Sequence, residues 1–423
     1  MRRVAFFALI NLVILGSLTA PVITGLPMVI ARLVPEGERT GALAAVTICG
    51  ALAAVVANPV FGALSDRTPG RFGRRRPWLL GGAVVGLVGS IVIVAADSVV
   101  VLTLGWVLAQ TAYNASFAAV AALLGDQVAE EQRAAASGLF GAAAFLGTVP
   151  PLLLATVLPA RLDIVVLAMP IAALIVVAIC CSRISDPPLQ RTDSATAGLR
   201  EHRTRIDIRH NREFAWMWLQ RFLMHLAISF TTVFTLFFVM ERLVLTSAES
   251  SPVVAAATLA GGAGIVVAAL GAGFLASRSG NYGPYILAAA IGLAVAAVLR
   301  ATVEGNTQLW VSAALGGLSL GIFYAVDLAL VLRAIPDGAA GTYLGVFNIA
   351  ETLPGTFAPA VAVAVLAVAG TDPLTGSGQN YTALYLTGAG IAVLALIPMV
   401  FLRSILTRTG RIEAEKPHRL VSQ

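Results

Sequence analysis

The sequence predicts an all-α membrane protein with twelve transmembrane helices, arranged as two six-helix bundles. Three observations support this prediction. Of the 423 residues, 58% are hydrophobic and 12% are charged, whereas a soluble domain carries about 25% charged residues. Apolar stretches long enough to span a bilayer recur along the chain, and basic residues gather in alternate connections between them. Lipid is therefore the expected solvent for most of the surface.

The apolar stretches define the expected helices, because about 20 apolar residues are needed to cross the hydrocarbon core. Six stretches precede a long polar segment and six follow it. The first six are residues 4–30, 41–64, 78–97, 99–124, 137–158 and 163–182. The second six are residues 214–240, 252–276, 284–303, 307–332, 341–369 and 381–402. The N-terminus resembles a signal peptide, but its apolar character continues to Ile30, which favours a first membrane helix.

The polar segment divides the chain. We expect a first bundle at residues 1–182, a cytoplasmic linker at 183–213, a second bundle at 214–402 and a cytoplasmic tail at 403–423. Short motifs support a repeat between the bundles, because GLFGAAAFL and GVFNIAETL lie at equivalent places, as do GALSDR and GFLASR. The matched glycines are Gly138 with Gly345 and Gly62 with Gly273.

Arginine placement predicts the topology. With the N-terminus in the cytoplasm, most of the 28 Lys and Arg residues lie on the cytoplasmic side. Both termini are then cytoplasmic in a multi-pass protein of the inner membrane, and the single lysine, with abundant Ala and Gly, suggests a bacterial source. The net charge of +6 is thus a topology signal, and no nucleic-acid partner is expected. The linker is expected to contact anionic lipid headgroups.

The stretch GALSDRTPGRFGRRRP at 62–77 joins the second and third expected helices. It resembles the signature loop of the major facilitator superfamily. Its longer form, with TPGRF before GRRRP, resembles the branch of sucrose transporters and glycoside–pentoside–hexuronide symporters. The segments LLGDQVAEEQRAAASGLFGA and FYAVDLALVLRAIPDGAAGTYLGVFNIAETLP resemble the same branch. The resemblance implies two bundles that rock around a central solute site.

The resemblance also implies a cytoplasmic gate at Gly62, Asp66, Arg67, Arg74 and Asp126. Physical reasoning supports the roles of Asp66 and Asp126. Asp66 lies where it can face a helix N-terminus, whose partial positive charge favours anions. Arginines of the loop can bridge to Asp126. The alternative is that these arginines only fix the topology.

Four ionisable residues lie inside expected helices of the second half: Arg221, His225, Asp327 and Glu351. Such residues are costly in a bilayer and are usually functional. Arg221 and Asp327 are expected at similar depths, about 10 Å from the cytoplasmic ends of their helices, as a structural or a functional ion pair. Glu351 is about 15 Å deep, near the midplane, where a carboxylate can bind and release a proton. His225 is either a coupling residue or a satisfied polar residue.

Neutral polar and aromatic side chains suit a sugar, because rings stack on its C–H face and amides bond its hydroxyls. The expected solute contacts are Gln110, Tyr113, Asn114, Trp218 and Asn348. The alternative is a polar seam that packs helices together. Acidic residues that branch members often carry on the first two helices are missing, apart from Asp66 at the end of the second. Proton coupling is therefore expected rather than sodium coupling.

These features predict a secondary transporter of a sugar or similar polar solute, monomeric and proton-coupled, whose partners are the solute, protons and lipids. A proton-driven exporter of drugs or natural products is the first alternative, and a non-transporting membrane receptor is the second. No enzyme is expected, because nucleophile motifs and a Walker loop are missing. No metal-ligand spacing is present, so neither metal nor cofactor is expected.

Overall fold

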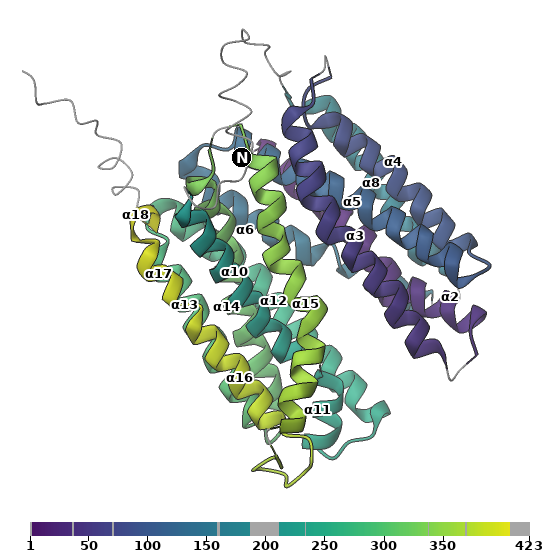
Figure 1. The fold of residues 1–423 in the computed structure, drawn as a ribbon, viewed down its shortest axis with the longest axis vertical. Coiled ribbons are helices and arrows are strands. Elements are labelled where there is room, and N and C mark those ends of the chain that lie inside the picture. Colours follow the sequence, from purple (N-terminus) through teal and green to yellow (C-terminus); the bar gives the residue numbers. More distant parts are fainter. Residues whose placement is uncertain are drawn as a thin grey trace, which may run out of the picture. The chain divides into compact units, whose positions relative to one another are not determined.

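The structure is a computed structural model that describes residues 2–35, 38–69, 72–158, 161–186, 211–232, 234–336, 338–368 and 370–406 (Figure 1). Within these ranges the chain is helical and contains no β-strand, which confirms the predicted all-α fold. Eleven of the described helices are long and apolar enough to cross a membrane. The number is twelve if one bent helix pair forms a single span. Most of the predicted linker and tail lies outside the described residues.

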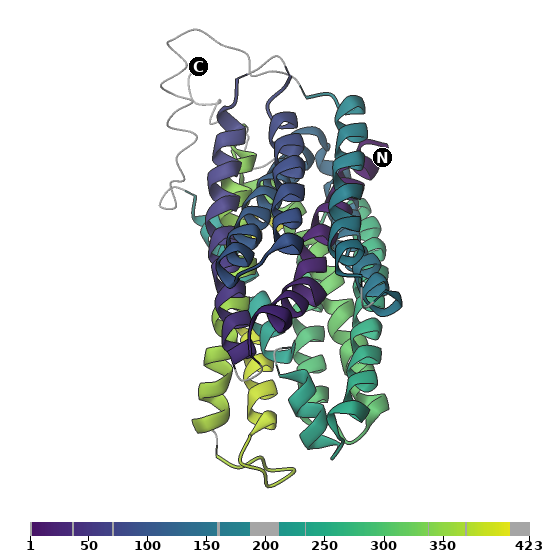
Figure 2. The same ribbon diagram turned by 90° about the vertical axis from the view of Figure 1, so that its right-hand side faces the viewer.

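Two compact units make up the fold. Unit 1 contains Met1–Val128, Ala143–Asp207 and Ile335–Thr352. Its helices are α1 (Arg2–Ala20), the π-helix η1 (Pro21–Gly25), α2 (Leu26–Leu33), α3 (Arg39–Arg67), α4 (Arg76–Ala95), α5 (Val99–Gln127), α7 (Val149–Val157) and α8 (Leu162–Arg183). The first part of α15 (Ala340–Val368) also belongs to it. Within unit 1, α4 packs along both α5 and α8 (Figures 1 and 2).

Unit 2 contains Ala129–Ala142, Ile208–Ala334 and Leu353–Gln423. Its helices are most of α6 (Glu130–Leu146), then α10 (Arg212–Thr232), α11 (Thr235–Arg242), α12 (Ser247–Ser279), α13 (Gly283–Ala301), α14 (Asn306–Ala334), α16 (Tyr381–Leu394), α17 (Ile397–Phe401) and α18 (Arg403–Leu406). The remainder of α15 completes it. Within unit 2, α14 packs against α12 and α13, and α13 packs against α16.

Two spans depart from straight helices. The first span passes through η1, which begins at Pro21 and widens the helix locally. Proline lacks an N–H donor, so such an irregularity is expected there. The predicted seventh span contains two helices, α10 and α11, which are bent by 43° at a short break.

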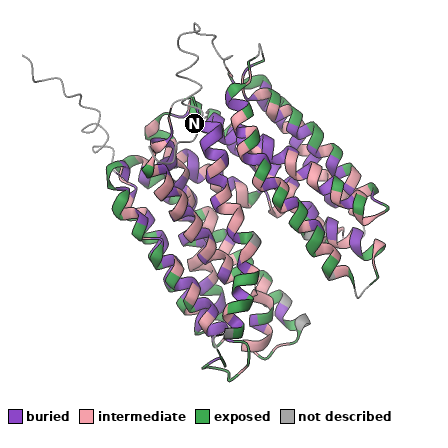
Figure 3. Ribbon diagram, viewed as in Figure 1, coloured by how far each residue is buried: buried purple, intermediate pink, exposed green. Residues whose placement is uncertain are grey.

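Lipid-facing surfaces are recognisable because they are apolar and exposed at helical spacing (Figure 3). On α4 the exposed side chains include Val84, Val88 and Ile91. On α8 they include Ile171, Ile175 and Ile179, again about one turn apart. A soluble protein seldom exposes apolar stripes of this length. These faces agree with a bilayer as the surrounding solvent.

Side chains cap several helices. Ser98 accepts a hydrogen bond from the Val101 N–H at the start of α5, and Asn380 accepts one from the Ala383 N–H at the start of α16. The loop before α16 is organised by Asp372, which accepts hydrogen bonds from the Leu374 and Thr382 N–H groups and pairs with Arg242. Burial alone raises the pKa of Asp372, but these hydrogen bonds and the Arg242 charge together lower it.

Glycines bring α15 and α3 into close contact within unit 1. A Cβ atom at Gly345 would lie 2.6 Å from the carbonyl oxygen of Asn58, and one at Gly62 would lie 2.7 Å from the carbonyl carbon of Gly341. Neither contact is possible for a side chain without movement of the backbone. The start of α15 is therefore fixed against α3 by glycines on both helices.

The same arrangement recurs within unit 2, between α6 and α12. A Cβ atom at Gly138 would meet the carbonyl group of Ala269, and one at Gly273 would lie 2.8 Å from the carbonyl oxygen of Ala134. Gly138 and Gly273 are the residues that the sequence repeat matches with Gly345 and Gly62. The repeat is thus visible as an equivalent helix contact inside each unit.

We predict that Gly345→Ala lowers the stability of the protein by about 1–3 kcal/mol, because the added methyl group collides with the α3 backbone. The thermal unfolding midpoint in detergent measures this loss. Gly355→Ala is the matched control on the same helix, since no described atom lies within 4 Å of its Cβ position. The control is expected to be neutral or stabilising, because alanine favours a helix interior. Equal midpoints for both variants would contradict the close contact.

Candidate gate and solute-path residues

Asp66 is buried at the C-terminal end of α3, where it meets the first turn of α15. Its Oδ1 accepts a hydrogen bond from the Gly341 N–H at 3.0 Å. Its Oδ2 accepts one from the Thr342 N–H and one from the Thr342 hydroxyl, each at 2.6 Å. The first N–H groups of a helix have no partner within the helix and carry partial positive charge. The Asp66 carboxylate therefore caps α15 and ties it to α3.

Arg75 compensates the remaining charge of Asp66. It lies directly before α4, and its side chain is fully buried. Its guanidinium donates to the Asp66 Oδ1 and the Ser65 hydroxyl, both at 2.5 Å, and to the Asp126 Oδ2 at 3.1 Å. Arg74 reaches the same Asp126 oxygen at 2.6 Å. One arginine thus connects the ends of α3, α5 and α15.

A third carboxylate fixes the loop that carries these arginines. The Asp186 Oδ2, just after α8, accepts hydrogen bonds from the backbone N–H groups of Arg75 at 2.6 Å and Arg76 at 2.9 Å. These N–H groups belong to the N-cap residue and the first residue of α4, so Asp186 acts as a cap from outside the helix. The position of the Arg75 side chain therefore depends on α8 as well as on its own loop.

The arginines at the centre of this cluster differ in part from those expected from the sequence. Asp66, Arg74 and Asp126 lie in the cluster, and Gly62 provides the close approach of α15. Arg67 lies on an exposed face of α3. The central cation is Arg75, which the sequence did not distinguish from its neighbours. Thr342 and Asp186 were also missed, since nothing local in their sequence marks them as partners of this loop.

Unit 2 contains a cluster at the equivalent place with its charges exchanged. The repeat puts Ser277 in the position of Asp66 and Arg333 in that of Asp126. Arg333, at the end of α14, pairs with the Glu130 Oε1 at 3.0 Å and donates to the carbonyl groups of Ile405 and Gly280. Its guanidinium carbon lies 4.0 Å from the centre of the Tyr282 ring. Here the buried cation belongs to a helix end and not to a loop.

Amide side chains form a buried network in the middle of unit 1. The Asn58 side-chain N–H on α3 donates to the Asn114 Oδ1 on α5 at 2.5 Å. Asn114 donates in turn to the carbonyl oxygen and the Oε1 of Gln110, one turn before it. Gln110 is only half-buried, so the network reaches the accessible surface of unit 1. The structure brings the predicted residues Gln110 and Asn114 together and adds Asn58.

Tyr113 lies apart from this network. It is fully buried, and its ring packs on Gly86 of α4, where a Cβ atom would lie 2.5 Å away. Trp106 is also buried and lies against Gly50 of α3. Its indole N–H has no hydrogen-bond partner among the described residues. The ring of Tyr113 therefore fills the α4–α5 contact, whereas Trp106 adds an unused donor on the α3 side of α5.

Asn348 and Glu351 lie on the part of α15 that belongs to unit 1. Asn348 is buried and Glu351 is half-buried. They follow Gly345, which packs on the backbone of Asn58, by three and six residues. At 1.5 Å per residue, Asn348 is about 4.5 Å along the helix axis from this contact. The α3–α15 contact therefore places both side chains within two turns of the level of Asn58.

Arg221 of α10 and Asp327 of α14 form a buried ion pair within unit 2. His225 lies one turn further along α10, also buried, with its ring 5.8 Å from the Tyr324 ring and 6.1 Å from the Phe323 ring. Trp218 stacks on Phe222, whose centroid is 5.4 Å away. Phe222 stacks in turn on Phe357 of α15 at 5.8 Å. Within the described ranges, no three His, Cys, Asp or Glu side chains are grouped to hold a metal ion.

Comparisons with known proteins agree with this architecture. The profile of the Major Facilitator Superfamily matches residues 45–359. No curated protein matches the sequence. Among solved structures, a bacterial homologue of the iron transporter ferroportin is similar with a TM-score of 0.73 at 14% identity, covering 96% of this chain and 100% of that chain.

Two further structures show the same fold. The proton:xylose symporter XylE has a TM-score of 0.71 at 13% identity, covering 97% of this chain and 98% of its own. The human organic anion transporter MFSD10 (TETRAN) has a TM-score of 0.71 at 17% identity, covering 94% and 99%. At these identities the likeness shows the fold alone. With the profile match over most of its length, the chain belongs to the Major Facilitator Superfamily and is a multi-pass membrane transporter of that type.

Proposed function

We propose that this transporter moves a sugar or glycoside across the bacterial inner membrane by alternating access, coupled to protons. The observation that carries the proposal is the neutral amide network of Asn58, Asn114 and Gln110. Amides both donate and accept hydrogen bonds, which matches the hydroxyl groups of a sugar. A charged site would lose its hydration when a neutral solute covers it, and a neutral site avoids this cost.

Unit 1 offers further groups for the same solute. Trp106, beside the network, supplies an indole donor and an aromatic face. Asn348 lies close to the level of Asn58 along α15. We assign solute contact to Gln110, Asn114 and Asn348, and a supporting role to Asn58. Trp218, in the aromatic row of unit 2, is the corresponding candidate there.

Glu351 is the proposed proton carrier. It is half-buried inside the apolar span Ala340–Ala367, where an ionised carboxylate is costly. The Arg221–Asp327 pair already compensates its own charge, so its proposed role is to hold α10 on α14. We propose that solute binding changes the protonation of Glu351, because Glu351 and the solute site lie in the same unit.

The Asp66 cluster is the proposed gate on the cytoplasmic side. It ties α15, the helix that carries Asn348 and Glu351, to the ends of α3 and α5. Breaking these hydrogen bonds releases the first turn of α15. The gate and the proton carrier therefore lie on one helix.

A transport assay in proteoliposomes tests the proposed function. Radiolabelled xylose, melibiose, sucrose and glucuronate are offered with an inward-directed proton gradient and without one. Gradient-driven accumulation of a neutral sugar supports the proposal. Efflux of an apolar drug against its gradient, with no sugar flux, would assign the chain to proton-driven export instead. Binding without flux would point to a receptor.

We predict that Glu351→Gln abolishes uptake driven by a proton gradient but keeps equilibrium exchange of solute, because the amide cannot carry a proton. Counterflow with labelled solute on one side measures exchange. Glu304→Gln, in a connection between helices, is the matched control and retains both activities. Loss of exchange together with uptake would show that Glu351 holds the structure or the solute and is no proton carrier.

We predict that Asp66→Asn shifts the resting state toward the inward-open form. The amide keeps the shape but loses the charge that pairs with Arg75 and with the α15 N-terminus, at a cost of about 3–5 kcal/mol. Labelling of single cysteines introduced near each end of α15 measures the shift. Asp97→Asn, on an exposed loop, is the control. An unchanged labelling pattern in Asp66→Asn would remove the cluster from the gate.

A further inference from the structure

Arg300 is a buried arginine that the transport scheme does not use. It is the last residue but one of α13 and is 7% exposed. Its Nη1 donates to the carbonyl group of Thr231 in the last turn of α10. Carbonyl groups in a last helical turn have no N–H partner within the helix, so this bond caps α10 where the seventh span breaks. A guanidinium has five N–H donors, and this cap uses one of them.

The charge of Arg300 is not compensated by a carboxylate. Among the described residues, the other buried arginines each pair with one: Arg75 with Asp66, Arg221 with Asp327 and Arg333 with Glu130. No described carboxylate is within ion-pair distance of Arg300. A buried charge without a counter-charge is strongly unfavourable, and a helix end offers only about half an elementary charge. A negative charge is therefore missing beside Arg300.

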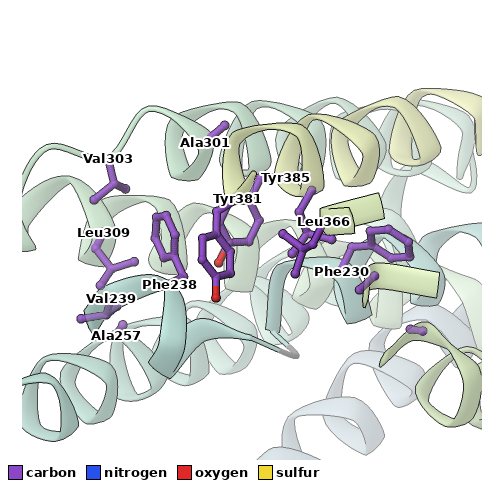
Figure 4. Close-up of a cluster of buried hydrophobic side chains, with 13 residues drawn as sticks. Phe230, Phe238, Val239, Ala257, Ala301, Val303, Leu309, Leu366, Tyr381 and Tyr385 are labelled. Atoms are coloured by element: carbon purple, nitrogen blue, oxygen red, sulfur yellow. The ribbon is translucent and has the colours of Figure 1, made fainter. Parts of the chain in front are cut away.

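Tyr385 supplies a second unused group at the same place. It lies on α16, and the Arg300 guanidinium carbon is 5.9 Å from the centre of its ring. The ring is fully buried in an aromatic cluster with Phe238, at 4.7 Å, and Tyr381 (Figure 4). Its hydroxyl has no hydrogen-bond partner among the residues that the structure describes. A buried hydroxyl without a partner is costly, so a bound acceptor would satisfy it.

The neighbouring Arg242, at the same end of unit 2, has both a counter-charge and a hydrogen-bond acceptor within the chain. It pairs with Asp372 at 3.0 Å and donates to the Thr382 hydroxyl at 2.7 Å. The Thr382 hydroxyl also lies 3.4 Å from the carbonyl oxygen of Ala301, the residue after Arg300. Asp372 is thus already engaged with Arg242 and with the loop backbone. Among the residues that the structure describes, no carboxylate is therefore left to compensate Arg300.

We infer that Arg300 and the Tyr385 hydroxyl bind a small anion, of the size of chloride. Water satisfies donors but does not compensate a charge, whereas an anion does both. The surrounding cluster, with Phe230, Leu384 and Ala301, is apolar, so it offers a large ligand no further polar group to orient it. The bound anion fixes the end of α10, the end of α13 and the start of α16 together, and is independent of the transported solute.

Thermal unfolding of the full-length protein in detergent tests the site. The midpoint is measured in sodium chloride, sodium acetate and sodium gluconate at one ionic strength, over a range of anion concentrations. A saturable rise with chloride relative to gluconate is expected, because a ligand that binds only the folded state stabilises it by mass action. A rise with acetate but not with chloride would assign the site to a carboxylate. Equal midpoints in all three salts would overturn the inference and leave Arg300 as a helix cap only.

Variants separate the site from a general salt effect. Tyr385→Phe removes the hydroxyl without changing the ring, and is expected to weaken the apparent anion affinity about tenfold. Arg300→Gln is expected to abolish the chloride dependence. Arg161→Gln is the control, since its side chain is 59% exposed, and it retains the full dependence. If Arg300→Gln does not fold, an unshifted chloride titration in Tyr385→Phe is sufficient to refute the site.

Discussion

The structure depends on one constraint: a charge that the chain buries has to be compensated by nearby groups, because lipid offers no water. Asp66 shows how this is achieved. Two backbone N–H groups, one hydroxyl and one guanidinium surround its carboxylate. Three of these donors belong to the first turn of α15, and the fourth is the guanidinium of Arg75 in the loop before α4. The hydrogen bonds that compensate the charge of Asp66 also attach α15 to α3. Their loss is therefore expected to move α15.

Glycine makes this compensation geometrically possible. A Cβ atom at Gly341 would lie 2.7 Å from the Arg75 Nη1 and 2.9 Å from the Asp66 Oδ1. The α15 backbone can deliver its N–H groups to the carboxylate only because this position has no side chain. Gly62 and Gly345 extend the same close approach along α3. Small residues are common in these Ala/Gly-rich spans and generally allow membrane helices to pack. At these positions glycine has a more specific role, which is to let the α15 backbone reach Asp66 and α3.

The sequence predicted the helical spans well, because a bilayer requires long apolar helices and leaves few other solutions. It did not predict the 43° break between α10 and α11, since neither proline nor glycine lies between Thr232 and Phe234. Within the site, the Arg221–Asp327 pair followed from helix depth alone. Arg75 did not, because five arginines in one loop look alike until the fold buries one of them. Tyr113 was grouped with Gln110 and Asn114, although a residue adjacent to Asn114 on a helix points about 100° away from it.

The exchanged charges of the two units have a physical consequence for the proposed gate. In unit 1 both partners of the Arg75–Asp66 pair are fully buried, and the carboxylate itself caps a helix. In unit 2 the Glu130 side chain is 24% exposed, and Arg333 is bound largely by carbonyl groups. A partly exposed pair is screened by solvent and contributes little, whereas a buried pair is costly to break. In the proposed gate, the free-energy cost of release is therefore expected mainly at Asp66, whereas the Arg333 cluster adds mainly to the cohesion of unit 2.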